Sequence, residues 1–333
     1  MLDGGVSACG RTISHDMASL SRGTNIMKKI IITKENANRR IDKFLAKEFF
    51  SYTRGDLIRS IREGKISINN KNVKPSYCLK ENDEITLDIK EKKSGLIPNK
   101  NIHLKIIFEN KDIIVLNKPS GIAVHPANGS EKNDTIVNGL ISLFPEIKLI
   151  HDTSSGAELR PGIVHRLDKE TSGVLIVAKN KKSFSELKNL FQSRQVAKKY
   201  LALVYGTPEN KKGTISKPLA KSADHKKQTV ANQRTRSKIR EAITKYKILK
   251  SLGKYSLLEV YPKTGRTHQI RIHLSSIGHP IVGDKIYGKK TKNLLVSRHF
   301  LHARQIKFEL FKKKLSFTAP IPKDFSEFIK KPS

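Results

Sequence analysis

The 333-residue sequence contains only two cysteines, Cys9 and Cys78, and no C-x-x-C pair. This scarcity argues against a disulfide framework or a thiol redox site, and it fits a reducing compartment such as the cytoplasm. Long apolar runs are missing as well. The longest, residues 173–178, has the length of a strand, whereas a membrane-spanning helix needs about 18 apolar residues. We therefore predict a globular protein without a membrane partner.

Metal-binding spacings are also missing, although the chain has 11 histidines. No H-E-x-x-H or H-x-x-x-H motif occurs, and His268 and His273 stand five positions apart. We expect no bound metal ion.

Acidic residues are scarce relative to basic ones. The chain has 30 Asp and Glu against 65 Lys and Arg, which gives a formal net charge of +35. Such an excess repels itself unless a polyanion compensates it, and it speeds the encounter with nucleic acid. A generally lysine-rich composition is the alternative explanation, because Lys, Asn and Ile are all abundant. The charge favours a nucleic-acid partner but does not say whether the contact is catalytic.

The N-terminal 26 residues carry no apolar core of a signal peptide, and Asp3 and Asp16 argue against a transit peptide. Met27 resembles a second translation start. We expect residues 1–37 to be a disordered extension and lead-in to the first domain.

A small α/β module is predicted over residues 38–90, because Ile41, Phe44 and Leu45 share one helical face. Its other elements are a helix from Thr53 to Gly64 and strands at 66–68 and 85–89. Basic residues follow the second helix and its exit and are expected to dock phosphates: Arg54, Arg59, Arg62 and Lys65.

Residues 91–103 are polar, contain Gly and Pro, and are predicted to be a linker. Strand patterns dominate the domain predicted over residues 104–327. The expected strands are 106–108, 112–116, 173–178, 200–205, 257–261 and 305–308, and the expected helices are 135–144, 183–192 and 267–278. This pattern predicts an α+β fold, in which the small module precedes a large mixed, mainly antiparallel sheet flanked by helices.

The loop around Asp168 is the first candidate for chemistry. Arg166 and Lys169 flank the aspartate, and their charges would keep its carboxylate ionised. An ionised carboxylate in a loop can act as a nucleophile or a base. An aspartate that only stabilises its own turn is the alternative.

Five motifs, in order along the chain, resemble the RluA-type family of pseudouridine synthases. The module at 38–90 resembles an S4-type RNA-binding domain, so the resemblance covers roughly residues 38–325. The motifs are Asn117 to Pro126, His165 to Gly173, Lys199 to Gly206, Gly265 to His273, and Leu301 to Ala303.

This resemblance implies an isomerase that converts uridine to pseudouridine without a cofactor. Asp168 matches the catalytic aspartate of the family, which either attacks the sugar C1′ or first removes a sugar proton. Tyr200 matches the tyrosine that stacks on the uracil, and Arg271 matches the arginine that pairs with the aspartate. Ordinary core packing of Tyr200 and a purely structural ion pair at Arg271 are the alternatives.

Further residues are expected to contact the RNA. The target base has to leave the helical stack before it can react, and Arg166 matches the arginine that fills the vacated space or holds the flipped nucleotide. A solvated arginine is the alternative. Arg266 and His268 are expected to touch the substrate or its neighbouring loops.

Within the family, residues 156–161 and 281–288 look most like members that act on the large ribosomal subunit. We expect structured RNA, large-subunit ribosomal RNA or its precursor particle, as the partner, and a monomeric chain. The alternatives are a tRNA-directed synthase, a non-catalytic ribosome-assembly protein that kept the fold, and an RNA-cleaving hydrolase. The intact set of Asp168, Tyr200 and Arg271 argues against the second alternative. The third would need a metal cluster or a histidine acid–base pair.

Overall fold

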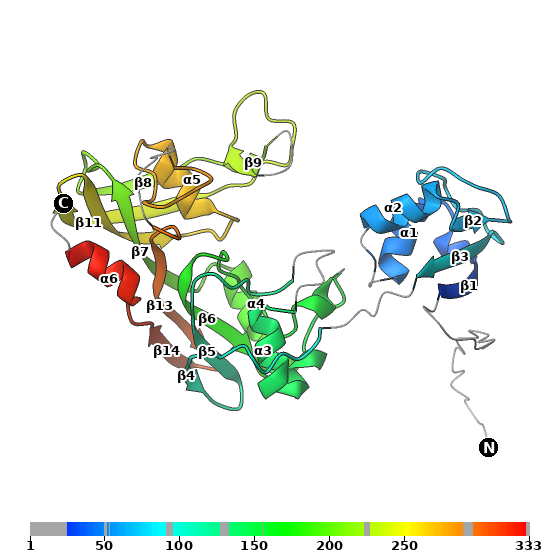
Figure 1. Cartoon of the computed structure of the whole chain (residues 1–333), viewed down its shortest axis with the longest axis horizontal. Helices are drawn as coiled ribbons and strands as arrows, with labels where there is room; N and C mark the ends of the chain where they lie inside the picture. Colours follow the sequence, from blue (N-terminus) through cyan, green and yellow to red (C-terminus); the bar gives the residue numbers. More distant parts are fainter. Residues whose placement is uncertain are drawn as a thin grey trace, which may run out of the picture. The chain divides into compact units, whose positions relative to one another are not determined.

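The computed structural model describes residues 25–49, 52, 54–90, 96–126, 133–154, 156–222, 227–288 and 296–330. The chain divides into two units, Met1–Ser94 and Gly95–Ser333 (Figure 1). Residues 1–24 of the predicted extension and the predicted helix start at Thr53 lie outside the described residues. None of the described helices has both the length and the apolar character required to cross a membrane.

The first unit is a three-stranded antiparallel sheet packed against two helices. Its core contains the predicted helical face of Ile41, Phe44 and Leu45. The elements are β1 Asn25–Ile31, a 3-10 helix at Lys34–Asn36, α1 Ile41–Glu48, α2 Arg54–Arg62, β2 Ile66–Ile68 and β3 Glu84–Lys90. Strand β1 pairs along its whole length with β3, so part of the predicted lead-in before residue 38 contributes a strand to this unit.

The second unit is built on a nine-stranded sheet with the order β4-β5-β6-β13-β7-β12-β11-β8, in which β14 pairs with β13. All pairs are antiparallel except β13 with β6, so the predicted α+β fold with a mainly antiparallel sheet is confirmed (Figure 1). The strands of the sheet are β4 Ile106–Glu109, β5 Ile113–Lys118, β6 Ser172–Ala178, β7 Ala197–Tyr205, β8 Lys212–Ser216, β11 Ile243–Leu252, β12 Tyr255–Pro262, β13 Leu301–Leu310 and β14 Lys313–Thr318.

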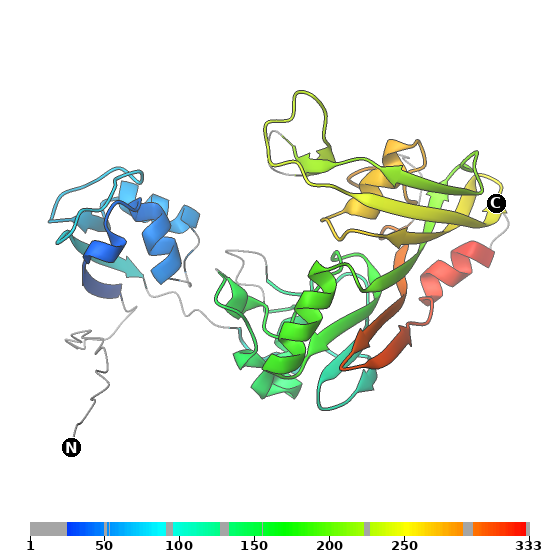
Figure 2. The ribbon, with the colours of Figure 1, turned by 180° about the vertical axis from the view of Figure 1, so that it is seen from behind.

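Strands β9 Leu219–Lys221 and β10 Gln228–Val230 form a separate ribbon, which projects beyond the main sheet in Figure 2. No strand between residues 206 and 252 was predicted from the sequence. The helices of the second unit are α3 Ile136–Leu143, α4 Lys181–Gln192, α5 Gln269–Ser276 and α6 Lys323–Lys330, with 3-10 helices at Pro145–Leu149 and Ala157–Leu159.

Helices cover both faces of the central strands, which explains why the apolar run of β6 does not alternate with polar residues. Ile176 of β6 packs with Leu187 of α4, whereas the neighbouring Leu175 faces the other way and packs with Leu140 of α3. Strand β7 is covered in the same manner by α5 on one face and α6 on the other.

Three predicted boundaries need correction. Helix α4 begins at Lys181, before the predicted start at residue 183, and is capped by Asn180, whose side chain accepts a hydrogen bond from the Ser183 N–H. Helix α5 begins at Gln269 rather than at Thr267.

The predicted linker also ends earlier than residue 103. Leu96 is buried against Val137 and Ile141, and the Asn138 side chain donates a hydrogen bond to the Ile97 carbonyl. The described part of this segment therefore belongs to the second unit.

Strand β13 joins the two halves of the sheet. It pairs with β7 over most of its length but with β6 through only two residue pairs, His302–Ser172 and Ala303–Gly173. Gly173 has a φ angle of +118°, and a Cβ atom there would lie 2.2 Å from the Ala303 carbonyl oxygen. A glycine is required at this junction.

We predict that Gly173→Ala destabilises the second unit by roughly 3 kcal/mol or more, because it adds a severe overlap to an unfavourable φ angle. Gly121→Ala is the matched control, since Gly121 has a φ of +86° but no atom within 4 Å of an added Cβ. Thermal unfolding of the two variants measures the difference. Equal losses of stability would show that the approach to β13 does not constrain residue 173.

Candidate active site

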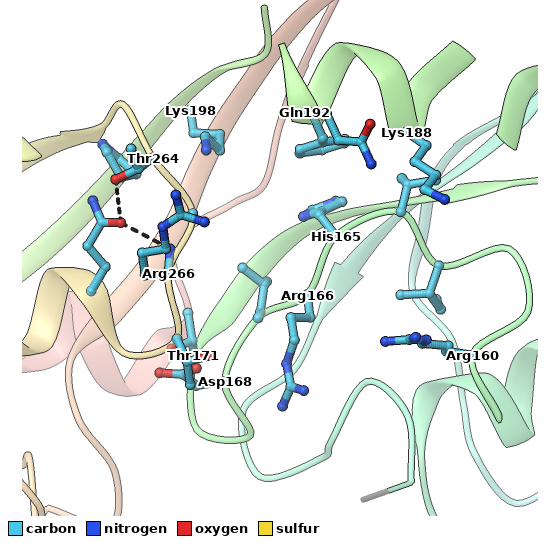
Figure 3. Close-up of a pocket in the computed structure, with 18 of the residues that line it drawn as sticks. Arg160, His165, Arg166, Asp168, Thr171, Lys188, Gln192, Lys198, Thr264 and Arg266 are labelled. Carbon is cyan, nitrogen blue, oxygen red and sulfur yellow. Dashed lines mark hydrogen bonds between the residues drawn. The ribbon is translucent and has the colours of Figure 1, made fainter. Parts of the chain in front are cut away.

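An open pocket of about 730 Å³ lies in the second unit (Figure 3). The loop containing Asp168, the start of β7 and the turn leading into α5 form its walls. Among the described residues, only two carboxylates, Asp152 and Asp168, line the pocket, whereas basic side chains surround it: Arg160, Arg166, Lys188, Arg194, Lys198, Lys263, Arg266 and Arg271. The pocket is therefore strongly cationic.

The Asp168 carboxylate contacts a buried guanidinium. Arg271 Nη1 donates to Asp168 Oδ2 over 3.0 Å. The other edge of the same guanidinium donates two hydrogen bonds to Asp284, with Nε to Oδ2 at 2.7 Å and Nη2 to Oδ1 at 2.9 Å. Arg271 is 4 % exposed, so its side chain is fixed between the two carboxylates.

Burial alone would lower the pKa of Arg271, but the hydrogen bonds and charges of Asp284 and Asp168 outweigh it and raise that pKa. For Asp284, burial would raise the pKa, and the Arg271 guanidinium lowers it instead. The Asp168 side chain is 19 % exposed to the pocket. Among the described residues, its Oδ1 atom accepts no hydrogen bond, so one oxygen is oriented and the other is free to meet a substrate.

A buried lysine fixes the main chain next to Asp168. Lys118 is fully buried, and its Nζ donates to the carbonyls of Pro119, Ile122 and Lys169 at 2.7, 2.9 and 3.0 Å. Burial lowers its pKa to about 7, although the negative charge of nearby Glu170 opposes the shift. This side chain ties the loop that carries Asp168 to the end of β5.

Two buried histidines hold the end of the same loop. Thr171 Oγ1 lies 2.8 Å from His299 Nε2, and Ser172 Oγ lies 3.0 Å from His302 Nδ1. Burial lowers the pKa of each histidine to about 4, so both rings are neutral near pH 7. Because β13 and the segment before it supply the histidines, the loop is anchored to the centre of the sheet.

Tyr200 is half-buried on β7 and lines the pocket. Burial raises the pKa of its hydroxyl, and the negative charge of Asp168 raises it further. The phenol is therefore neutral near pH 7 and presents an aromatic ring beside the carboxylate.

Comparisons with known proteins match this arrangement. The sequence model of the RNA pseudouridylate synthase family matches residues 112–276, and that of the S4 domain matches residues 39–85. The ribosomal large subunit pseudouridine synthase C of Buchnera aphidicola subsp. Schizaphis graminum is 36% identical over 92% of this chain and 98% of its own length. This chain belongs to the RNA pseudouridine synthase family. The predicted family, with an S4 domain in front, is confirmed.

Two further relatives agree. The ribosomal large subunit pseudouridine synthase D of Borreliella burgdorferi is 35% identical over 91% of this chain and 92% of its own length. The solved structure of human RNA pseudouridylate synthase domain containing 1 superposes with a TM-score of 0.55 at 26% identity, covering 67% of this chain and 85% of that one.

The predicted RNA contacts of this pseudouridine synthase domain line the same pocket as Asp168, Tyr200 and Arg271. Arg166 is exposed and lies 3.2 Å from the His125 ring. The Arg266 Nε donates to the Glu241 carbonyl. His268 precedes α5 with a φ angle of +57°, so it lies outside the helix that was predicted to begin at residue 267.

In the S4 domain, a buried carboxylate orients two arginines. Asp42 is fully buried; both Arg40 and Arg54 donate two hydrogen bonds to it. Burial would raise the pKa of Asp42, and these arginines lower it instead. A cavity of about 490 Å³ adjoins this cluster, and Arg62 and Lys74 also line it.

The four basic residues predicted in this domain are thus not equivalent. Arg54 and Arg62 line the cavity, whereas Arg59 is exposed on α2 outside it. Lys65 lies 2.6 Å from the Glu63 carboxylate, so part of its charge is compensated.

Four residues that hold the site together were not predicted from the sequence: Asp284, Lys118, His299 and His302. Their segments were recognised as motifs, except for His299, but no spacing linked Asp284 to Arg271 or Lys118 to the Asp168 loop. The likeness of residues 281–288 to family members was the one signal that pointed towards Asp284.

We predict that Asp284→Asn slows pseudouridine formation at least tenfold, equivalent to about 1.4 kcal/mol, because it frees one edge of the guanidinium that orients Asp168. RNA affinity should change little. Single-turnover rates at saturating enzyme measure the effect. In a double-mutant cycle, Asp284→Asn should add little to Arg271→Lys, since both changes disturb one unit. A wild-type rate for Asp284→Asn would contradict the orienting role.

Proposed function

We propose that this enzyme isomerises uridines in large-subunit ribosomal RNA, with Asp168 as the nucleophile. The observation that carries this proposal is the carboxylate of Asp168 at the wall of a cationic pocket, held through one oxygen by buried Arg271. An ionised carboxylate can form a covalent intermediate and leave again without a redox cofactor.

The reaction is an isomerisation, so no atom enters or leaves overall. The bond between N1 of the uracil and C1′ of the ribose breaks, the base turns, and C5 bonds to C1′. The proton lost from C5 is balanced by the proton that N1 gains. Asp168 can serve either by attacking C1′ or by first removing a sugar proton, and both routes use the oxygen that Arg271 leaves free.

Tyr200 supports the base during this rearrangement. Its neutral ring lies beside Asp168 in the pocket, where a flat aromatic surface can stack on a uracil. A stacked base can turn in its own plane without losing that contact.

The target nucleotide has to leave the RNA stack to reach Asp168. Arg166 is exposed at the pocket, where it can hold the flipped nucleotide or fill the space it leaves. The excess of basic over acidic side chains lowers the cost of bringing phosphates close together.

Two observations favour ribosomal RNA as the substrate. Relatives that match nine-tenths of this chain are named as synthases of the ribosomal large subunit. The S4 domain supplies a second cationic surface, which suits a large structured RNA. These same considerations favour a cytoplasmic enzyme.

We predict that Asp168→Asn abolishes pseudouridine formation while RNA affinity stays within about twofold, because phosphate contacts dominate binding. The measurement is pseudouridine mapping in ribosomal RNA and tRNA from cells that carry either the wild-type gene or the Asp168→Asn variant. Loss of sites in the large subunit alone is expected. Unchanged sites would contradict the nucleophile, and loss confined to tRNA would contradict the substrate.

The S4 domain docks the RNA through the arginines that Asp42 orients. Each guanidinium binds Asp42 through Nε and Nη2, so its remaining edge is available for a phosphate. The side chains of Arg40 and Arg54 are 41% and 49% exposed. A fixed fork loses less side-chain entropy when it binds a phosphate than a freely rotating one.

We predict that Arg54→Lys weakens RNA binding about fivefold, close to 1 kcal/mol, although the charge is kept, because lysine cannot contact Asp42 and a phosphate with a planar fork. Arg59→Lys is the matched control on the same helix, since Arg59 is exposed and outside the cavity. Equilibrium binding of each full-length variant measures the difference. Equal affinities for the two variants would contradict the orienting role of Asp42.

A further inference from the structure

Lys198 is a cation of the pocket that the proposed chemistry does not use. It lies two residues before Tyr200 on β7, on the same side of the strand, and lines the pocket with it. Among the described residues, no carboxylate or carbonyl accepts a hydrogen bond from its amine. Its Nζ reaches towards the α5 turn and lies 3.8 Å from the position that a Cβ at Gly265 would occupy.

The adjacent Lys199, in contrast to Lys198, has partners for its amine. Lys199 points to the other side of β7, where its amine lies 2.7 Å from Glu259 and above the ring of Tyr261. Lys199 is therefore neutralised by a carboxylate of the protein, whereas Lys198 faces the pocket.

His165 supplies a second hydrogen-bond donor of the same pocket, close enough to Lys198 for the charge of that lysine to act on its ring. Strand β13 pairs with β6 only at Ser172 and Gly173. The N–H of Ile176, farther along β6, therefore has no partner in β13 and donates to His165 Nε2 over 2.9 Å instead. The ring also stacks on Phe191 with centroids 4.6 Å apart. The imidazole is therefore fixed in position, and Figure 3 shows it among the residues around the pocket.

The tautomer of His165 follows from these contacts. Burial and, to a smaller extent, the positive charge of Lys198 together lower its pKa to about 3, so the ring is neutral. Since Nε2 accepts a hydrogen bond, the proton is on Nδ1. His165 lines the pocket, and among the described residues no group accepts a hydrogen bond from its Nδ1.

Lys198 and His165 thus offer an ammonium group and an N–H donor, with no anion from the described residues between them. The two carboxylates of the pocket are already engaged, Asp152 by Lys188 and Asp168 by Arg271. We propose that Lys198 and His165 form a subsite for a phosphodiester group of the RNA, next to the uridine at Asp168. This inference rests on the proposed function, because it assumes that the pocket holds a nucleotide.

The spacing along β7 suits this assignment. Residues two apart on a strand are separated by about 7 Å, so a base over Tyr200 and a phosphate at Lys198 belong to one nucleotide or to adjacent ones. The desolvation of Lys198 agrees, since burial lowers its pKa to about 8 and a bound phosphate would compensate the charge. The subsite would fix the backbone while the base turns.

Binding of RNA to full-length Lys198→Met, Lys198→Arg and Lys199→Met variants, measured across a range of salt concentrations, tests the subsite. Lys198→Met should bind about tenfold more weakly, and its slope of log K against log salt should be shallower by about 0.7–0.9, as expected for one lost phosphate contact. Lys198→Arg should keep the slope, and Lys199→Met should keep both slope and affinity. An unchanged affinity and slope for Lys198→Met, or an equal loss for Lys199→Met, would overturn the inference.

RNA with a neutral methylphosphonate on either side of the target uridine identifies the phosphate. One of the two substitutions should weaken binding to the wild-type enzyme and have no further effect on Lys198→Met. Equal effects on both proteins would overturn the assignment. Pseudouridine formation by the wild-type enzyme on the unmodified form of this RNA separates the proposed function from the proposed subsite. If the wild-type enzyme forms no pseudouridine, the proposed function fails. If it does and Lys198→Met binds normally, the subsite alone is wrong.

Discussion

The guanidinium of Arg271, held between Asp284 and Asp168, is the contact on which the active site depends. Its bidentate pair with Asp284 is buried and rigid, and its third hydrogen bond transmits that rigidity to the more exposed Asp168. A buried arginine needs such partners, because an unpaired charge there would be costly. The need to neutralise one cation therefore also positions Asp168, the carboxylate that we propose as the nucleophile.

The loop that carries Asp168 lies where two strands of the sheet are only partly paired. Strands β6 and β13 pair through only two residue pairs, and His165 satisfies the backbone N–H that this leaves on β6. Buried polar side chains fix the loop that carries Asp168 and leads into β6. Lys118 holds it from one side, and His299 and His302 hold it from the other. Since these groups are hydrogen-bonded and the histidines are neutral, they anchor the loop without competing with Arg271 for the carboxylate.

The large positive charge is organised differently in the two units. In the S4 domain, Asp42 fixes two arginines into a cluster whose remaining edges face outward. In the synthase domain, some cations are neutralised by neighbouring carboxylates, whereas Lys198 meets no carboxylate among the described residues. In our proposals, the arginines paired with Asp42 meet phosphates through their free edges, whereas Lys198 meets a phosphate as an unpaired charge.

By itself, the sequence determined the family, the S4 domain, the mainly antiparallel sheet and the helices near 136–143 and 181–192, because ordered motifs and local periodicity are properties of short segments. It also brought Asp168, Tyr200 and Arg271 into one hypothesis through their likeness to a family. It did not reveal β1, the short strands near 212–230, or the start of α5 at Gln269, where pairing partners and an unusual φ angle decide the structure. Only the tertiary structure brought Asp284 to Arg271 and left Lys198 unpaired among the described residues, because such contacts depend on distance in space and not on spacing along the chain.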